Sequence, residues 1–394
     1  MGRPRLEQGQ GRRGLGPRRD LGARVSTFRH PGLAEPRNKE EWRRYRDSRA
    51  PEQPVMPPYE EYLKLSDDDK DDLNEDRDNY HSALAIIDTS QVKRLHYLME
   101  RRMKANARRA AGARAGLVFD GPPTVGKSTL VKLFAARYER RLRRKHPERF
   151  QDGYESNGMI IDYTPVVYLS IPARATPKDL SVLLADYLGM VQRGRDTQTD
   201  ITNHVLSVLS DVGTELVIID DVHFLDMSAK EGRVVNDHLK YIANETAATF
   251  VYTGVDLEKS GLFLEGQAAS RATQTSGRNT RYPVRKFGCK TSQEKLEWAE
   301  TVKALEDTLV LYRHRPGKLV KLCSYFYDRT DGSICALTDL FRESAIEAVM
   351  SGEEAITRKL MDRIEISEYA QATYRKVVQQ RRQKSAAGSK VAAS

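Results

Sequence analysis

One segment of the chain has the residue types and spacing of a phosphate-binding loop. Residues 121–128 read Gly-Pro-Pro-Thr-Val-Gly-Lys-Ser, which matches the pattern G-x-x-x-x-G-K-[ST] in full. Such a loop wraps backbone N–H groups around a phosphate, and the helix after it points its N-terminus at the anion. Lys127 would neutralise the β- and γ-phosphate oxygens, and Ser128 would offer its hydroxyl to Mg²⁺. We expect the nucleotide to contact Gly121, Pro122, Pro123, Thr124, Val125, Gly126, Lys127, Ser128 and Thr129.

Two adjacent carboxylates, Asp220 and Asp221, directly follow the apolar run 216–219. A loop of this kind needs an acidic element at the end of a neighbouring strand, and this segment has that form. Asp220 would hold Mg²⁺ through water, and Asp221 would polarise the water that attacks the γ-phosphate. Many ATPases of this kind carry Glu at the second position. The shorter Asp leaves nucleotide binding intact, whereas it could slow hydrolysis.

Two further positions could act on the γ-phosphate. Thr253 ends a predicted strand at 249–253 and would touch the attacking water or the γ-phosphate, as a sensor residue does. Arg278 or Arg281 could reach the γ-phosphate of a neighbouring subunit and stabilise transition-state charge, and we favour Arg278. Alternatively, Thr253 could be present only for its strand propensity, and the two arginines could be solvated charges in a loop.

The elements that must position these residues alternate between short apolar runs and helical patterns. Strands are expected at 115–120, 166–171, 215–220, 249–253 and 282–287, and helices at 128–144, 177–190, 201–212 and 233–246. Strands that alternate with helices imply a mostly parallel sheet covered on both faces. From Thr291 the chain is expected to be all-helical, beginning with a capping box formed by Thr291 and Glu294 and a helix to about residue 312. The fold class is therefore α/β, with a small helical lid after the sheet.

Composition divides the chain into five expected regions. A basic arm over 1–55 is rich in Gly, Pro and Arg and is expected to be disordered, and a helical segment over 56–110 includes one helix from about 80 to 107. The phosphate-binding core covers 111–288, the lid covers 289–365, and 366–394 are expected to finish a basic helix and continue as a disordered tail. The acidic stretch after Ser66 suits a capped helix start.

The overall composition excludes several classes of protein. The chain has 394 residues, 39% of them hydrophobic, which is enough for a core. No stretch approaches the roughly 20 apolar residues of a membrane span, and the N-terminal segment lacks the apolar region of a secretory signal. Cys289, Cys323 and Cys335 do not have the spacing of a zinc site or a disulfide framework, so we expect reduced thiols in the cytoplasm.

Basic residues gather on both sides of the phosphate-binding loop. The first cluster contains Arg101, Arg102, Lys104, Arg108 and Arg109, and the second contains Arg137, Arg140, Arg141, Arg143, Arg144 and Lys145. Either cluster could be an ordinary solvated helix face. With a net charge of +10, however, the two clusters together favour binding to nucleic acid through its phosphates. No recognition helix or zinc finger predicts base-specific readout.

The order of these elements resembles an AAA+ ATPase, and more narrowly the TniB family of transposition ATPases, relatives of the MuB, TnsC and IstB regulators. The matching residues are Arg77-Asp78-Asn79-Tyr80-His81, Thr89, Val92, the loop at 121–129, Ile219 to Leu225, Tyr252-Thr253-Gly254 and Thr330 to Ile334. Two departures are Asp221 in place of Glu and Thr-Asp-Gly at 330–332 in place of a Gly-rich turn. A second sensor could be Arg313, Lys318 or Lys321, which the pattern does not distinguish.

The resemblance implies a three-layer AAA+ sandwich with a lid, and ATP and Mg²⁺ as cofactors. It also implies a homo-oligomer, ring or filament, that assembles on duplex DNA, selects target sites and recruits a DDE-type transposase at the bacterial nucleoid. Two other functions stay open. One is a replication initiator or helicase loader of the same superfamily, and the other is a nucleotide-dependent scaffold switch with little hydrolysis.

Overall fold

The structure is a computed structural model. It describes residues 24–25, 34–83, 86–110, 114–151, 154–156, 158–224, 230–257 and 279–391. Within these ranges, no helix is long and apolar enough to span a bilayer.

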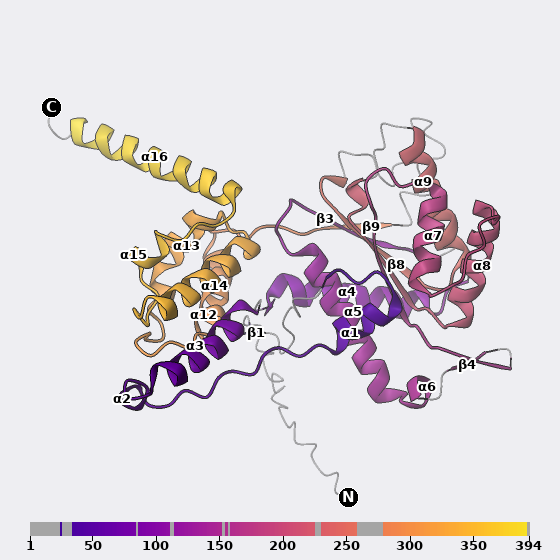
Figure 1. The fold of residues 1–394 in the computed structure, drawn as a ribbon. Helices are drawn as coiled ribbons and strands as arrows, with labels where there is room; N and C mark the ends of the chain where they lie inside the picture. The colour runs from indigo at the N-terminus through magenta and orange to yellow at the C-terminus, as the bar shows by residue number, and fades with distance from the viewer. Residues whose placement is uncertain are drawn as a thin grey trace, which may run out of the picture.

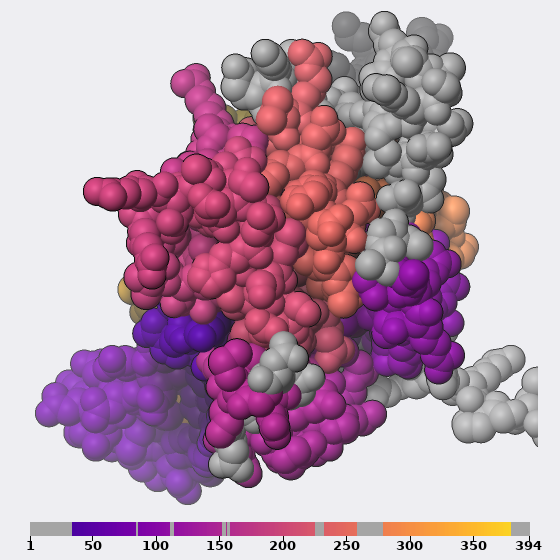
Figure 2. Space-filling view, turned by 90° about the vertical axis from the view of Figure 1, so that its right-hand side faces the viewer, coloured from indigo at the N-terminus to yellow at the C-terminus, as the bar shows by residue number. Residues whose placement is uncertain are grey.

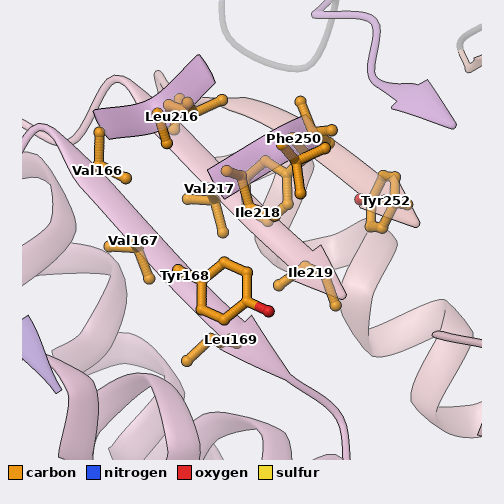
Figure 3. Close-up of a cluster of buried hydrophobic side chains, with 14 of the residues drawn as sticks. Val166, Val167, Tyr168, Leu169, Leu216, Val217, Ile218, Ile219, Phe250 and Tyr252 are labelled. Atoms are coloured by element: carbon orange, nitrogen blue, oxygen red, sulfur yellow. The ribbon is translucent and has the colours of Figure 1, made fainter. Parts of the chain in front are cut away.

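A five-stranded parallel sheet forms the centre of the core, in the order β6-β7-β8-β3-β9. The strands are β3 (Leu117–Asp120), β6 (Val166–Ser170), β7 (Leu216–Asp220), β8 (Thr249–Gly254) and β9 (Thr280–Pro283). Val, Ile, Leu, Phe and Tyr side chains bury β6, β7 and β8 on both faces (Figure 3). Because all five strands run parallel, the loops after β3, β7 and β8 meet at one edge of the sheet. The first four predicted strands are confirmed, and the fifth begins earlier than expected.

Helices cover both faces of this sheet, as the alternating pattern predicts (Figure 1). Helices α4 (Ser90–Asn106) and α5 (Lys127–Lys145) lie on one face, and α7 (Pro177–Tyr187), α8 (Gln198–Asp211) and α9 (Lys230–Glu245) lie on the other. Capping boxes formed by Thr176 with Asp179 and by Thr197 with Asp200 start α7 and α8. A short helix α6 (Glu148–Gln151) and an antiparallel hairpin of β4 (Tyr154–Ser156) and β5 (Met159–Ile161) extend from the core. The three-layer α/β class is confirmed.

The lid has its own apolar core, built around Trp298, Phe326 and Phe341. Its helices are α12 (Ser292–Glu306), η2 (Val320–Leu322), α13 (Cys323–Thr330), α14 (Ile334–Met350) and α15 (Arg358–Met361). The predicted capping box of Thr291 and Glu294 is present. The first lid helix ends at Glu306 rather than near residue 312. There the Thr308 hydroxyl donates to the Leu305 carbonyl, 2.7 Å away, and so competes with the helical hydrogen bond.

The expectation of one helix from 80 to 107 is wrong. The chain instead forms α3 (Asp67–Ser82), β2 (Ile87–Asp88) and α4, while residues 84 and 85 lie outside the described ranges. Thr89 accepts a hydrogen bond from the Val92 N–H and starts α4 anew. Helix α3, capped by Ser66 as expected, packs against α14 of the lid. Its Arg77 is fully buried in an ion pair with Glu354 of the lid.

The arm at 1–55 is not devoid of structure either. Strand β1 (Arg24–Val25) pairs with β2, and α1 (Lys39–Asp47) buries Trp42, Tyr45 and Arg46. Trp42 and Tyr45, one turn apart, give this charged helix enough apolar surface to dock on the core. The overall composition of the arm does not predict this docking. The short helix α2 (Tyr59–Tyr62) lies between α1 and α3 in the chain. Residues 1–23 and 26–33 of the predicted arm lie outside the described residues.

Helix α16 (Glu368–Val391) continues beyond residue 381, where the sequence predicted a disordered tail. Its first turns are fixed to α13, because Arg329 donates to Gln371 at 3.1 Å and lies over the ring of Tyr374. The rest of the helix projects away from the lid (Figure 1).

His96 of α4 provides a test of the packing between α4 and α5. Its Nε2 lies 2.9 Å from the Leu130 carbonyl oxygen, and burial lowers its pKa from 6.5 to about 4. Below pH 6.5 the unfolded imidazole takes up a proton that the folded one refuses until about pH 4. Stability should therefore fall by about 2 kcal/mol between pH 7 and pH 5, measured by urea unfolding.

His96→Gln keeps a donor for Leu130 and should remove this part of the pH dependence. The exposed His204 of α8 gives a matched control, because His204→Gln should keep the wild-type dependence. An equal loss in His96→Gln and wild type would contradict the assignment.

Candidate nucleotide-binding site

The predicted phosphate-binding loop lies between β3 and α5, at the edge where the parallel strands end. Gly126 is the N-cap of α5 and has φ +80°, and Thr124 has φ +61°. Left-handed residues beside the start of a helix turn successive N–H groups toward one point, which forms an anion site. At Gly121, an added Cβ would lie 2.0 Å from the Val284 carbonyl oxygen. Glycine is therefore required there, because the chain leaving β9 passes directly against the loop.

Lys127 is buried at the first position of α5. Its Nζ donates to the carbonyl oxygens of Gly121 and Pro122, at 2.9 and 2.7 Å. Burial lowers the pKa of Lys127, and the nearby Asp220 opposes this shift. The ammonium group thus lies over the loop, where the phosphates of a nucleotide would bind.

Asp220 ends β7 and is only 1% exposed. Its Oδ1 accepts hydrogen bonds from the Thr253 hydroxyl and from the Asp221 N–H, and its Oδ2 accepts one from the Tyr168 hydroxyl at 2.8 Å. Burial raises the pKa of Asp220, and a hydrogen bond from Ser128 lowers it. The Ser128 hydroxyl and this carboxylate supply only oxygen, which is the donor chemistry that Mg²⁺ prefers. The two predicted metal residues are therefore adjacent.

Asp221 has a left-handed backbone, with φ +57°. Aspartate adopts this conformation more readily than longer side chains, because its short carboxylate can hydrogen-bond locally. Here Ser170 of β6 donates to Asp221 Oδ2 at 3.2 Å. The backbone thus gives a reason for Asp in place of Glu. The side chain is 38% exposed, so solvent can reach its carboxylate.

Thr253, at the end of β8, is fully buried and contacts Asp220 rather than open space. Its sensor role stays a prediction, and the contact in the structure orients the Asp220 carboxylate. Arg278 lies outside the described residues. Arg281 lies on the edge strand β9, opposite Val118 of β3. Of the candidates for a second sensor, Arg313 donates to Tyr59 at 2.9 Å, and Lys318 and Lys321 are exposed.

The lid meets the loop through Ser333, for which the sequence analysis predicted a place at the start of a lid helix but no contact with the loop. The Ser333 hydroxyl donates to the Thr124 carbonyl oxygen at 2.9 Å and also caps α14. Ser333 directly follows Asp331 and Gly332, which both have positive φ. These two residues end α13 and turn the chain toward the loop. This contact links the lid directly to the phosphate site.

A pocket opens beside the loop, between the core and the lid. Its wall comes from the segment before α4, the start of α5, the connection from β9 to the lid and the start of α14. Among its lining residues are Ile86, Ile87, Gly126, Thr129, Phe287 and Ile334. An apolar cleft beside a phosphate loop is suited to the base of a nucleotide. The sequence analysis did not find these walls, because they are distant in the chain.

The basic cluster on α5 largely serves the fold. Arg137 pairs with Asp88 at 2.8 Å, Arg140 donates to carbonyl oxygens of α1 and its C-cap, and Arg141 pairs with Glu100 at 3.2 Å. Arg144 and Lys145 are exposed. On α4 and in the turn directly after it, by contrast, Arg101, Lys104, Arg108 and Arg109 are exposed. The exposed basic surface therefore belongs mainly to the end of α4.

The profile of the family described as Bacterial TniB protein matches residues 79–278, just over half of the chain. The chain belongs to the TniB family. The matched residues include the phosphate-binding loop and the strand that ends at Asp220. No curated protein matches its sequence.

Three solved structures have a similar chain course. The Aeropyrum pernix ORC2 protein in its ADPNP-ADP complexes has 13% sequence identity and a TM-score of 0.48, and the match covers 69% of this chain and 65% of that one. The Aeropyrum pernix ORC1 protein in complex with DNA has 16% identity and a TM-score of 0.47, and the match covers 72% of this chain and 64% of that one. Cdc6p from Pyrobaculum aerophilum has 13% identity and a TM-score of 0.42, and the match covers 70% of this chain and 68% of that one. The chain thus spans just under two thirds of each ORC protein. The nucleotides in the ORC2 complexes and the DNA in the ORC1 complex are ligands of those proteins.

Gly121→Ala tests the close approach at the loop. The new methyl group would collide with the Val284 backbone, so we expect a loss of about 1–3 kcal/mol in urea unfolding. Gly194→Ala is the matched control, because its Cβ would meet nothing within 4 Å. We expect the control to change stability by less than about 0.5 kcal/mol. Equal stability of the two variants would be incompatible with this packing.

Proposed function

We propose that the chain is an ATP-dependent, DNA-binding regulator of transposition. It assembles on duplex DNA, selects target sites and recruits a DDE-type transposase, in the bacterial cytoplasm at the nucleoid. The observation that carries the proposal is a phosphate-binding loop whose Ser128 bonds to Asp220 and whose Thr124 contacts the lid, beside a pocket, in a chain of the TniB family.

The residues of the site would divide the work as follows. Lys127 would turn from the loop carbonyls to the β- and γ-phosphate oxygens, while Ser128 and Asp220 would hold Mg²⁺. When bound, Mg²⁺ supplies positive charge that offsets charge on the phosphate oxygens. Asp221, held by Ser170, would orient the attacking water and take its proton. Thr253 would keep Asp220 in place from the neighbouring strand.

Assembly would depend on ATP because a neighbouring copy completes the site. Arg278, or Arg281 on the edge strand, would reach the γ-phosphate bound by the adjoining protomer. A nucleotide held by two protomers stabilises their association only while both contact it. Hydrolysis would remove that shared contact and release the protomers from DNA.

Lys127→Ala should weaken ATP binding by about tenfold to a hundredfold, because a charged hydrogen bond is worth roughly 1.5–3 kcal/mol. Calorimetry with ATP and Mg²⁺ measures this loss directly. Electron microscopy with duplex DNA should then show assemblies for wild type with ATP, and none for the variant. Lys145→Ala, at the exposed end of α5, should behave as wild type. Assemblies that persist unchanged in Lys127→Ala would refute ATP bridging.

The end of α4 is the surface we propose for DNA phosphates. Neutralising Arg101 and Arg108 to Gln should weaken binding to any duplex sequence and reduce the slope of log affinity against log salt by about two. Fluorescence anisotropy across a salt series measures both effects. The control neutralises Arg193 and Arg195, which are exposed between α7 and α8. If both pairs reduced the slope equally, α4 would have no special part in DNA binding.

A further inference from the structure

A chain of polar contacts connects the segment before the core to Asp220. Glu35 Oε1 lies 2.5 Å from Lys132 Nζ, and Glu35 Oε2 lies 3.0 Å from the oxygen of the Tyr168 hydroxyl. The same hydroxyl is within 2.8 Å of Asp220 Oδ2. Figure 3 shows the Tyr168 hydroxyl pointing toward the carboxyl end of β7, where Asp220 lies. A residue nearly a hundred positions before the loop helix thus lies one side chain away from the predicted metal carboxylate.

Glu35 is held in this position by residues 34–48, which we name the strap. Trp42 stacks on Tyr168 with ring centroids 6.1 Å apart and donates to Glu139 at 2.7 Å, and Arg46 also pairs with Glu139. Lys39 and Arg43 pair with Asp162 at 3.1 and 2.5 Å. In Figure 2, α1 of the strap, in indigo, lies at the lower edge of the layer formed by α7 and α8. The strap is therefore docked by many contacts that do not involve the nucleotide site.

Lys132 needs the charge of Glu35. The Lys132 side chain is only 3% exposed, and a buried cation without a partner is costly. Glu35 is the one carboxylate that pairs with it among the described residues, and the rings of Tyr45 and Tyr168 surround it at 5.5 Å. The charge of Lys132 also acts on Asp220 and lowers the pKa of that carboxyl. If Glu35 were removed, Asp220 would be the carboxylate left to attract Lys132.

The Tyr168 hydroxyl has a single hydrogen, so it can donate to only one of the two carboxylates at a time. Lys132 satisfies Glu35 from the other side. This leaves the hydrogen of Tyr168 available to Asp220, whose Oδ2 it orients. In this arrangement Lys132 pairs with Glu35, and the neutral Tyr168 hydroxyl donates to Asp220.

We propose that Glu35 is a positioning residue for the metal site, which holds Lys132 away from Asp220 so that the Asp220 carboxylate stays free for a divalent cation. The inference rests on the proposed ATP and Mg²⁺ site, and it makes docking of the strap a condition for tight metal binding. Residues that orient a metal ligand typically change metal affinity by about ten- to a hundredfold when removed.

The test is direct metal binding by the full chain. Mn²⁺ is titrated in the presence of a non-hydrolysable ATP analogue, and bound Mn²⁺ is measured by electron paramagnetic resonance. Glu35→Ala should raise the Mn²⁺ midpoint by about tenfold or more. Adding Lys132→Met, which removes the competing cation, should return the midpoint close to that of wild type. Glu40→Ala, an exposed acid of the same strap, is the matched control and should leave the midpoint unchanged.

Two results would overturn the inference while wild type still binds the metal and the analogue. One is an equal midpoint for Glu35→Ala and Glu40→Ala. The other is a double variant as weak as Glu35→Ala alone, since a variant that merely loosens the strap is not rescued by Lys132→Met. A wild-type chain that binds no analogue would instead overturn the proposed function.

Discussion

A carboxylate that is almost completely removed from water must find its hydrogen bonds within the protein, and Asp220 imposes this constraint on the whole core. Its donors come from the start of α5, from β6, from β8 and from the backbone of the next residue. These elements can converge on one carboxylate only because the strands are parallel and adjacent in the sheet. The burial and full hydrogen bonding of Asp220 therefore require three features together. These are the strand order, the apolar residues that bury β7 and the polar residues at the strand ends.

Hydrogen bonds and ion pairs within the protein also explain the polar face of α5. Glu139 is buried on this helix between Trp42 and Arg46 of α1, and Arg140 reaches the backbone of the same segment. Glu139 and Arg140 are thus covered by α1, whereas Arg144 and Lys145 at the end of α5 stay exposed. Part of the surface that composition alone suggests for nucleic acid is therefore occupied by the protein's own chain.

Local patterns were sufficient to predict the loop, four of the five strands and the capped start of the lid from the sequence. Each depends on residues that are neighbours in the chain, such as the apolar run before Asp220 or the pair Thr291 and Glu294. The docking of Trp42, the pairing of β2 with β1 before Thr89 and the contact of Ser333 with Thr124 depend on partners far away in the chain. Such contacts leave no periodicity in the sequence, so the pocket walls and the use of the α5 arginines could not be predicted.

The connection from β9 to the lid has a mechanical consequence at the other end of the molecule. Lys286, which lines the pocket, pairs with Asp331 at 2.7 Å and lies over the ring of Tyr369, in the first turn of α16. A helix of 24 residues is about 36 Å long at 1.5 Å per residue. A tilt of roughly ten degrees at its root would therefore displace its far end by about 6 Å. The position of the far end of α16 therefore depends strongly on the geometry around Lys286.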